Sequence, residues 1–221
     1  ILEDWTQSTQ GHKQLGGAHD IQWIASGLPG AGHFLIFNNA EYLSEHTSQS
    51  YVVEINPYLN ASGVDTGAYV NPPVAGYNTV TFPAVMEKPA RQISKQVVYN
   101  FSAKSPLTLF SQIGCSAQRL SNGNTLICAD TEGYIMEVTP SGDTVWDYIV
   151  PVTSGGIVSV IGDRLAMVNS IFRAYRYKAT DPALVGRTLT PGATIAGRTT
   201  VANPYAGTSG YQALQRATEL Q

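Results

Sequence analysis

The heptapeptide YVVEINP at residues 51–57 returns as YIMEVTP at residues 134–140, with the tyrosine, glutamate and proline in the same places. Two further pairs recur in the same order: HFLIFNN (33–39) with NTLICAD (124–130), and VYNF (98–101) with VWDY (145–148). Internal self-similarity is the signature of repeat architectures, so these pairs decide the fold more strongly than any single motif. Each copy is predicted to consist of four strands joined by turns.

Turn signals separate the predicted strands of the second copy. Asn122-Gly123 predicts a type I′ hairpin turn, and Ser141-Gly142 predicts the tip of the next hairpin. A third, shorter unit is expected to follow, with strands at 157–161, 165–169 and 172–177. Antiparallel four-stranded units that repeat at about 45–50 residues are the blades of a β-propeller. We therefore predict an all-β fold, a partial β-propeller of about three blades.

The blades are expected within residues 1–179, with a long insertion at 58–94 that the second copy lacks. Loop-closure entropy grows slowly with length, so such an insertion is cheap. Residues 180–221 are rich in Gly, Pro and Thr and are expected to form an extended tail with at most a short terminal helix. Propellers usually have about four to eight blades. The ring is therefore expected to be closed by another chain or by a segment outside this sequence.

Composition excludes several classes of function. Only 13% of the 221 residues are charged, the formal net charge is -3, and Lys and Arg do not cluster. This gives no electrostatic footprint for nucleic acid or for an anionic membrane. No apolar run approaches the roughly 20 residues of a transmembrane helix. The spacing of the 4 histidines is not that of metal ligands, and no cofactor or metal is expected.

The two cysteines, Cys115 and Cys128, lie on the two arms of the predicted Asn122-Gly123 hairpin. A type I′ turn there would place Cys128 opposite Ala117, with Cys115 on the same face two residues away. Such diagonal neighbours are about 7–8 Å apart, which is long for a relaxed disulfide. We therefore favour two free, buried thiols and do not expect a catalytic cysteine.

The histidines are the main candidates for chemistry. His19 opens a predicted strand after the flexible Gly16-Gly17, so it is either a partly buried histidine bonded to the backbone or a reactive group in the channel. His33 and His46 are expected to be structural or solvated, and His12 to be exposed. The segment FRAYRYKA (172–179) alternates aromatic and basic residues, which indicates either a solvated edge strand or a contact with an anion.

The segments GGAHDIQWIASGLPGAGHFLIFNN, AQRLSNGNTLICADTEGYIMEVTPSGDTVWDYIVP and FRAYRY resemble, in this order, the C-terminal half of the propeller of the bacterial arylsulfotransferases. The resemblance extends over residues 11–191. It implies transfer of a sulfuryl group from an aryl sulfate to a phenol, without a nucleotide donor, through a transiently sulfated histidine. That residue would be His19, with Asp20, Phe37, Asn38 and Asn39 binding the substrate.

The resemblance also implies partners and a location. The remaining functional histidines and the arginine of the family lie upstream of the matching region. Activity would therefore require the N-terminal half of the propeller, as a separate or cleaved chain; assembly as a homo-oligomer is also considered. Aryl sulfates and phenols would be the small-molecule partners, and the location would be periplasmic or extracellular. The alternative is a non-catalytic propeller that serves as a binding, structural or assembly module; a quinone-cofactor propeller is disfavoured because its acidic metal ligands are missing.

Overall fold

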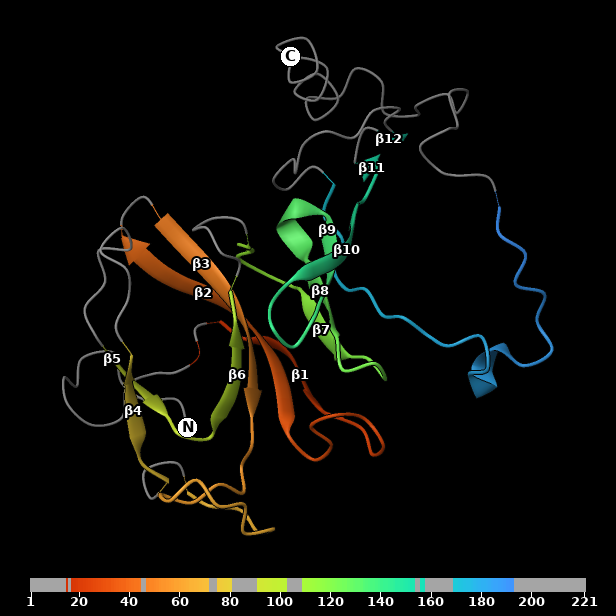
Figure 1. Ribbon diagram of the computed structural model, residues 1–221. Coiled ribbons are helices and arrows are strands. Elements are labelled where there is room, and N and C mark those ends of the chain that lie inside the picture. Colours follow the sequence, from red (N-terminus) through yellow and green to blue (C-terminus); the bar gives the residue numbers. More distant parts are fainter. Residues whose placement is uncertain are drawn as a thin grey trace.

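The computed structural model describes residues 15, 17–44, 47–71, 75–80, 91–102, 109–153, 156–157 and 169–192. Its main features are two four-stranded antiparallel sheets, ordered β1-β2-β3-β6 and β10-β9-β8-β7 (Figure 1). The strands of the first sheet are β1 (His19–Trp23), β2 (Phe34–Ser44), β3 (Thr47–Ile55) and β6 (Val97–Phe101). Those of the second are β7 (Ser116–Arg119), β8 (Thr125–Ala129), β9 (Tyr134–Val138) and β10 (Thr144–Ile149). The predicted all-β class is confirmed.

The repeated segments occupy equivalent strands of the two sheets, as the sequence predicted. HFLIFNN and NTLICAD lie in β2 and β8, YVVEINP and YIMEVTP in β3 and β9, and VYNF and VWDY in β6 and β10. The insertion at 58–94 contains two strands that the sequence did not predict, β4 (Tyr77–Val80) and β5 (Arg91–Ser94), which pair with each other. A further pair is β11 (Val152–Thr153) with β12 (Gly156–Ile157). Two short 3-10 turns, η2 (Asp130–Glu132) and η3 (Pro182–Leu184), complete the described elements.

The predicted type I′ turn at Asn122-Gly123 is wrong. Gly123 has a φ of 89°, but Asn122 does not take a positive φ, and the hairpin closes with Leu120 N–H donating to the carbonyl oxygen of Asn124 at 2.8 Å. The loop therefore holds three residues, with the glycine alone in the left-handed region, as in a type I turn followed by a bulge. The next hairpin closes in the same way between Thr139 and Asp143.

The three-residue loop shifts the pairing of β7 with β8 by one position. Ser116, rather than Ala117, is the partner of Cys128. A shift of one residue moves a side chain to the other face of a sheet, and Cys115 and Cys128 belong to different core clusters instead of sharing a face. Both cysteines are free and buried, which confirms the prediction of two free thiols.

The predicted strand at 172–177 is also wrong, although this segment lies along β7. Ser116 Oγ accepts from Ala174 N–H at 3.1 Å and donates to Ala174 O at 3.2 Å. Gln118 in the same way accepts from Arg176 N–H at 2.7 Å and donates to Arg176 O at 3.0 Å. Side chains of β7 thus take the place of a backbone ladder, so no strand forms. Residues 158–168, the tail after 192, His12 and His46 lie outside the described residues.

The main hydrophobic core lies between the two sheets. Leu35, Phe37 and Val52 from the first sheet pack against Ile127 and Met136 from the second. A smaller cluster lies on the other face of the second sheet, where Leu126, Cys128 and Ile135 pack against Ile171 and Ala174. The first sheet therefore packs against one face of the second, and residues of segment 171–178 pack against the other face.

A polar contact between units, here named the clasp, occurs twice. Glu54 of β3 accepts from His33 Nδ1 at 2.6 Å and pairs with Arg119 of β7. Glu137 of β9 accepts from Asn124 Nδ2 at 2.6 Å and pairs with Arg176. The two glutamates are the repeated residue of the YVVE and YIME segments, and each bonds an arginine from the following unit.

The first clasp leaves no space beside its glutamate. A Cβ at Gly30 would lie 2.5 Å from Glu54 Oε1, and Gly30 has a φ of 82°. The side chains of Glu54 and Arg119 are only 8% and 7% exposed, whereas that of Arg176 in the second clasp is 42% exposed. Removing one member of a buried pair leaves the other charge desolvated, which costs far more than the loss of an exposed pair.

We predict that Arg119→Met lowers the free energy of unfolding by about 3 kcal/mol and that Arg176→Met lowers it by about 1 kcal/mol or less. The reason is that Arg119→Met leaves Glu54 buried with His33 as its remaining side-chain partner in the described part of the chain. Urea denaturation of both variants beside the parent protein measures the difference. Equal losses in the two variants would show that burial does not set the strength of the clasp.

Candidate functional site

His19 is the first residue of β1, and two oxygens hold its ring. Its Nδ1 lies 2.7 Å from Asn39 Oδ1 and 2.8 Å from the carbonyl oxygen of Gly17. Both oxygens can only accept, so Nδ1 must carry the hydrogen. In the neutral ring this leaves the lone pair on Nε2, the nitrogen that can act as a nucleophile.

Asn39, on β2, is fully buried, and its own partners fix the direction of its amide. Its Nδ2 donates to Ser111 O at 3.1 Å and Gly114 O at 3.3 Å, and it lies 3.5 Å from Cys115 Sγ. With the nitrogen turned toward these acceptors, Oδ1 must face His19. Asn39 is therefore a positioning residue for the imidazole.

Asp130 brings a negative charge toward His19. It follows β8 at the position that corresponds to Asn39 in the first copy, and it is 6% exposed. Burial raises the pKa of this carboxyl, and the nearby positive charge that His19 can carry lowers it. Gly114 leaves room for Asp130, because a Cβ there would lie 1.9 Å from Asp130 Oδ2. The Asp130 carboxyl and the His19 ring therefore interact electrostatically.

Asp20 lies in a bulge of β1 and joins three units. It has a φ of 54°, a conformation that costs energy for a residue with a side chain. Its Oδ2 accepts from Ala117 N–H at 3.1 Å and from Gln22 Nε2 at 2.9 Å. Its Oδ1 accepts from Tyr175 Oη–H at 2.5 Å and lies 3.6 Å from an Arg173 nitrogen. The carboxylate predicted to bind substrate thus has protein partners on both oxygens.

The other predicted substrate-binding residues are buried. Phe37 is the strand partner of His19, but it is fully buried in the main core. Asn38 is 3% exposed. The structure therefore brings together His19, Asn39 and, through the backbone of β1, Asp20. His33 lies in the first clasp, as expected of a structural histidine.

Sequence reasoning allowed a bond from His19 to the backbone without identifying Gly17 as the partner. It missed Asp130 and the Ser111–Cys115 turn that holds Asn39. Asp130 could have been found, because the repeat aligns it with Asn39. The turn could not, since it contacts Asn39 across more than 70 positions of sequence without any motif.

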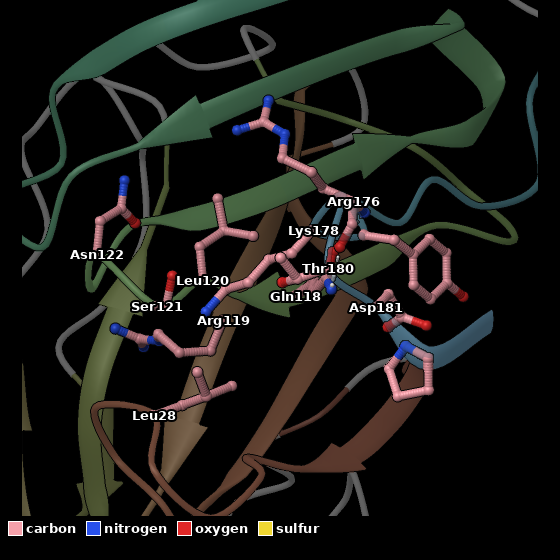
Figure 2. A pocket seen from close by; sticks show the side chains of 12 residues that line it. Leu28, Gln118, Arg119, Leu120, Ser121, Asn122, Arg176, Lys178, Thr180 and Asp181 are labelled. Atoms are coloured by element: carbon pink, nitrogen blue, oxygen red, sulfur yellow. Dashed lines mark hydrogen bonds between the residues drawn. The ribbon is translucent and has the colours of Figure 1, made fainter. Parts of the chain in front are cut away.

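An open cavity of about 590 Å³ lies at the β7–β8 turn (Figure 2). Its cationic residues include Arg119 and Arg176, which are already paired in the two clasps. Leu28, Asn122, Lys178 and Asp181 also line it. Its lining contains none of the predicted site residues, so it is distinct from the His19 site.

Neither a metal centre nor a membrane span was found within the described residues. No group of three or more His, Cys, Asp or Glu side chains in this part of the chain could hold a metal ion. No helix in the same residues is long and apolar enough to cross a bilayer. Comparison of the chain with family models, curated proteins and solved structures gives no match.

The two thiols are predicted to be unreactive in the native protein. Burial raises the pKa of Cys115 to about 11 and that of Cys128 to about 12. Because the thiolate is the reactive form, titration with Ellman's reagent at pH 8 should detect no thiol before unfolding and both thiols in denaturant. Rapid labelling of either cysteine in the native protein would contradict the burial that the structure gives them.

Proposed function

We propose that this chain forms part of a β-propeller that transfers a sulfuryl group from an aryl sulfate to a phenol, with His19 as the nucleophile. The observation that carries the chemical part is the contact of His19 Nδ1 with Asn39 Oδ1 and Gly17 O, because it leaves Nε2 free to react. Covalent capture by a histidine divides one difficult transfer into two easier steps. The resemblance in the sequence supplies the substrate class.

The propeller part of the proposal is supported by the way each unit contacts the next. Gln22 of β1 donates to the carbonyl oxygen of Ala117 in β7, and Gln118 of β7 donates to that of Arg176. The Glu-to-Arg clasp repeats in the same direction. A contact that recurs from unit to unit is what radial repetition requires. The two sheets and segment 171–178 would then be successive blades.

In the first step, Nε2 of His19 attacks the sulfur atom and the bond from sulfur to the aryl oxygen breaks, releasing the phenolate. In the second, the oxygen of the acceptor phenol attacks the same sulfur, the bond to Nε2 breaks, and the acceptor loses its proton to solvent or to a base. The sulfated ring keeps its hydrogen on Nδ1 and carries positive charge. Asn39 Oδ1, Gly17 O and the charge of Asp130 stabilise that intermediate.

The proposal includes a partner and a location. Three units are fewer than the four to eight that usually close a propeller. The N-terminal half of the ring, from a separate or cleaved chain, would supply further groups that stabilise the leaving phenolate. A periplasmic or extracellular location goes with the resemblance.

A second candidate is a non-catalytic propeller that binds or assembles with a partner. Asp20 favours it, because both of its carboxylate oxygens are bonded to protein groups that join the units. The burial of Phe37 and Asn38 also favours it, since neither offers a surface to a substrate. The two candidates differ in whether His19 becomes sulfated.

The test uses the protein in its native assembly with p-nitrophenyl sulfate and phenol. We predict release of p-nitrophenol and, without an acceptor, a gain in intact mass of one SO₃ group on His19. His19→Asn keeps a side-chain donor for Asn39 but has no nucleophilic nitrogen, so it should lower the rate roughly 10³-fold or more.

His33→Asn is the matched control, because the corresponding position of the second copy is Asn124, which bonds its glutamate in the same clasp. This variant should keep the parent rate. Undiminished turnover in His19→Asn, or absence of the mass gain in the parent protein, would favour the non-catalytic candidate.

A further inference from the structure

We infer that Arg173 binds the anionic sulfuryl end of the aryl sulfate beside His19, with Tyr175 as its positioning residue. This inference rests on the proposed function and adds to it the group that recognises the charge of the substrate. It uses a segment, 171–178, that follows the second sheet and whose basic residues the sequence left open between a solvated edge and an anion contact.

The first step is the position of the segment. Ser116 and Gln118 hold the backbone of Ala174 and Arg176 along β7. Arg173 and Tyr175 alternate along the segment with these two residues. Both side chains reach the first unit: Tyr175 Oη donates to Asp20 Oδ1 at 2.5 Å, and Arg173 lies 3.6 Å from the same oxygen. Asp20 directly follows His19 in β1.

The second step is a connection from the other side. Cys115 N–H donates to the carbonyl oxygen of Phe172 at 3.1 Å. Cys115 Sγ lies 3.5 Å from Asn39 Nδ2, and Asn39 Oδ1 accepts from His19 Nδ1 at 2.7 Å. The contacts therefore form a closed ring that runs from His19 through Asn39, Cys115 and the 172–173 backbone to Asp20 and back to His19. Arg173 belongs to the same ring of residues as the nucleophile.

The third step concerns charge. Asp20 and Asp130 both lie near His19, and both would repel an anion. A cation is needed to offset them, and Arg173 already lies 3.6 Å from Asp20 Oδ1, whereas Arg119 and Arg176 pair with the glutamates of the clasps. The Arg173 side chain is 43% exposed, so a sulfuryl group can approach it from solvent and accept hydrogen bonds from its planar guanidinium.

The fourth step is the support of the guanidinium. It stacks over the Phe172 ring at 4.8 Å from the ring centre, which restricts its plane. Burial and the hydrogen bond to Asp20 raise the pKa of Tyr175, and Arg173 acts against them. Tyr175 therefore stays a neutral phenol that bonds Asp20 Oδ1. Arg173 also contacts Asp20 and Tyr175, and the other donors of its five-donor fork can face the ligand.

Binding and chemistry can be tested separately. The probe is phenyl sulfate, measured by calorimetry on the His19→Asn protein in its native assembly, where no turnover interferes; phenol is the uncharged comparison. Adding Arg173→Ala should weaken phenyl sulfate at least about tenfold, because a charge-assisted bidentate contact is lost, and leave phenol unchanged. The affinity of the Arg173→Lys variant for phenyl sulfate should lie between those of the parent and the alanine variant. The lysine variant also replaces the alanine variant in the test if the latter does not fold.

Arg187→Ala, at an exposed arginine whose Nε donates to the carbonyl oxygen of Ala183, is the matched control and should bind like the parent. Unchanged affinity for phenyl sulfate in Arg173→Ala, or no binding by the His19→Asn parent, would overturn the inference. If binding depends on Arg173 but the wild-type histidine is never sulfated, the anion site stands and the proposed transfer fails.

Discussion

The buried pair of Glu54 and Arg119 is the contact on which the arrangement of the two sheets depends. It places a glutamate of β3 and an arginine of β7 in a region where both side chains are almost fully removed from water. Two ions in such a place are stable only when each is paired and its remaining groups are bonded. His33 bonds Glu54 and the carbonyl oxygen of Gly123 bonds Arg119, while the buried Nε of Arg119 has no hydrogen-bond partner among the described residues. The pairing specifies how one sheet lies on the next. The apolar core between the sheets adds stability but is less directional.

Sequence reasoning identified most of the strands but misplaced one register. The strands followed from alternating, repeated segments, in which propensity and repetition agree. The predicted register of β7 against β8 was wrong because of the turn between them. Of Asn122 and Gly123, only Gly123 takes a positive φ, and the resulting three-residue loop pairs Cys128 with Ser116 instead of Ala117. Turn chemistry of this kind is set by small differences between backbone conformations that a dipeptide does not determine. Segment 172–177 failed for another reason, because the side chains of Ser116 and Gln118 replaced the ladder.

The candidate site was predictable only where a motif marked it. His19 and Asn39 were named from the resemblance. In the structure His19 Nδ1 lies 2.7 Å from Asn39 Oδ1, although the two residues are 20 positions apart in sequence. The groups that complete their surroundings lie later in the chain: Gly114 and Cys115 contact Asn39, Asp130 lies beside Gly114, and Tyr175 bonds Asp20. These contacts join residues far apart in sequence, and no periodicity or spacing encodes them. The sequence does contain the repeat, and the repeat aligns Asn39 with Asp130.

The two ends of the repeat have diverged to different extents, and this separates architecture from chemistry. At the clasp end the glutamate and its arginine are kept in both copies, and His33 corresponds to Asn124, which makes an equivalent bond. At the other end His19 pairs with Phe37 in the first sheet, and Ser116 pairs with Cys128 at the equivalent place in the second. His19 therefore corresponds to Ser116, and Asn39 corresponds to Asp130. Ser116 serves packing, since it fixes the backbone of the next unit. The ring of His19 is instead bonded by the carbonyl oxygen of Gly17 and by the buried amide of Asn39 in its own sheet. The divergence between the two copies is therefore concentrated at His19 and Asn39, where the proposed site lies.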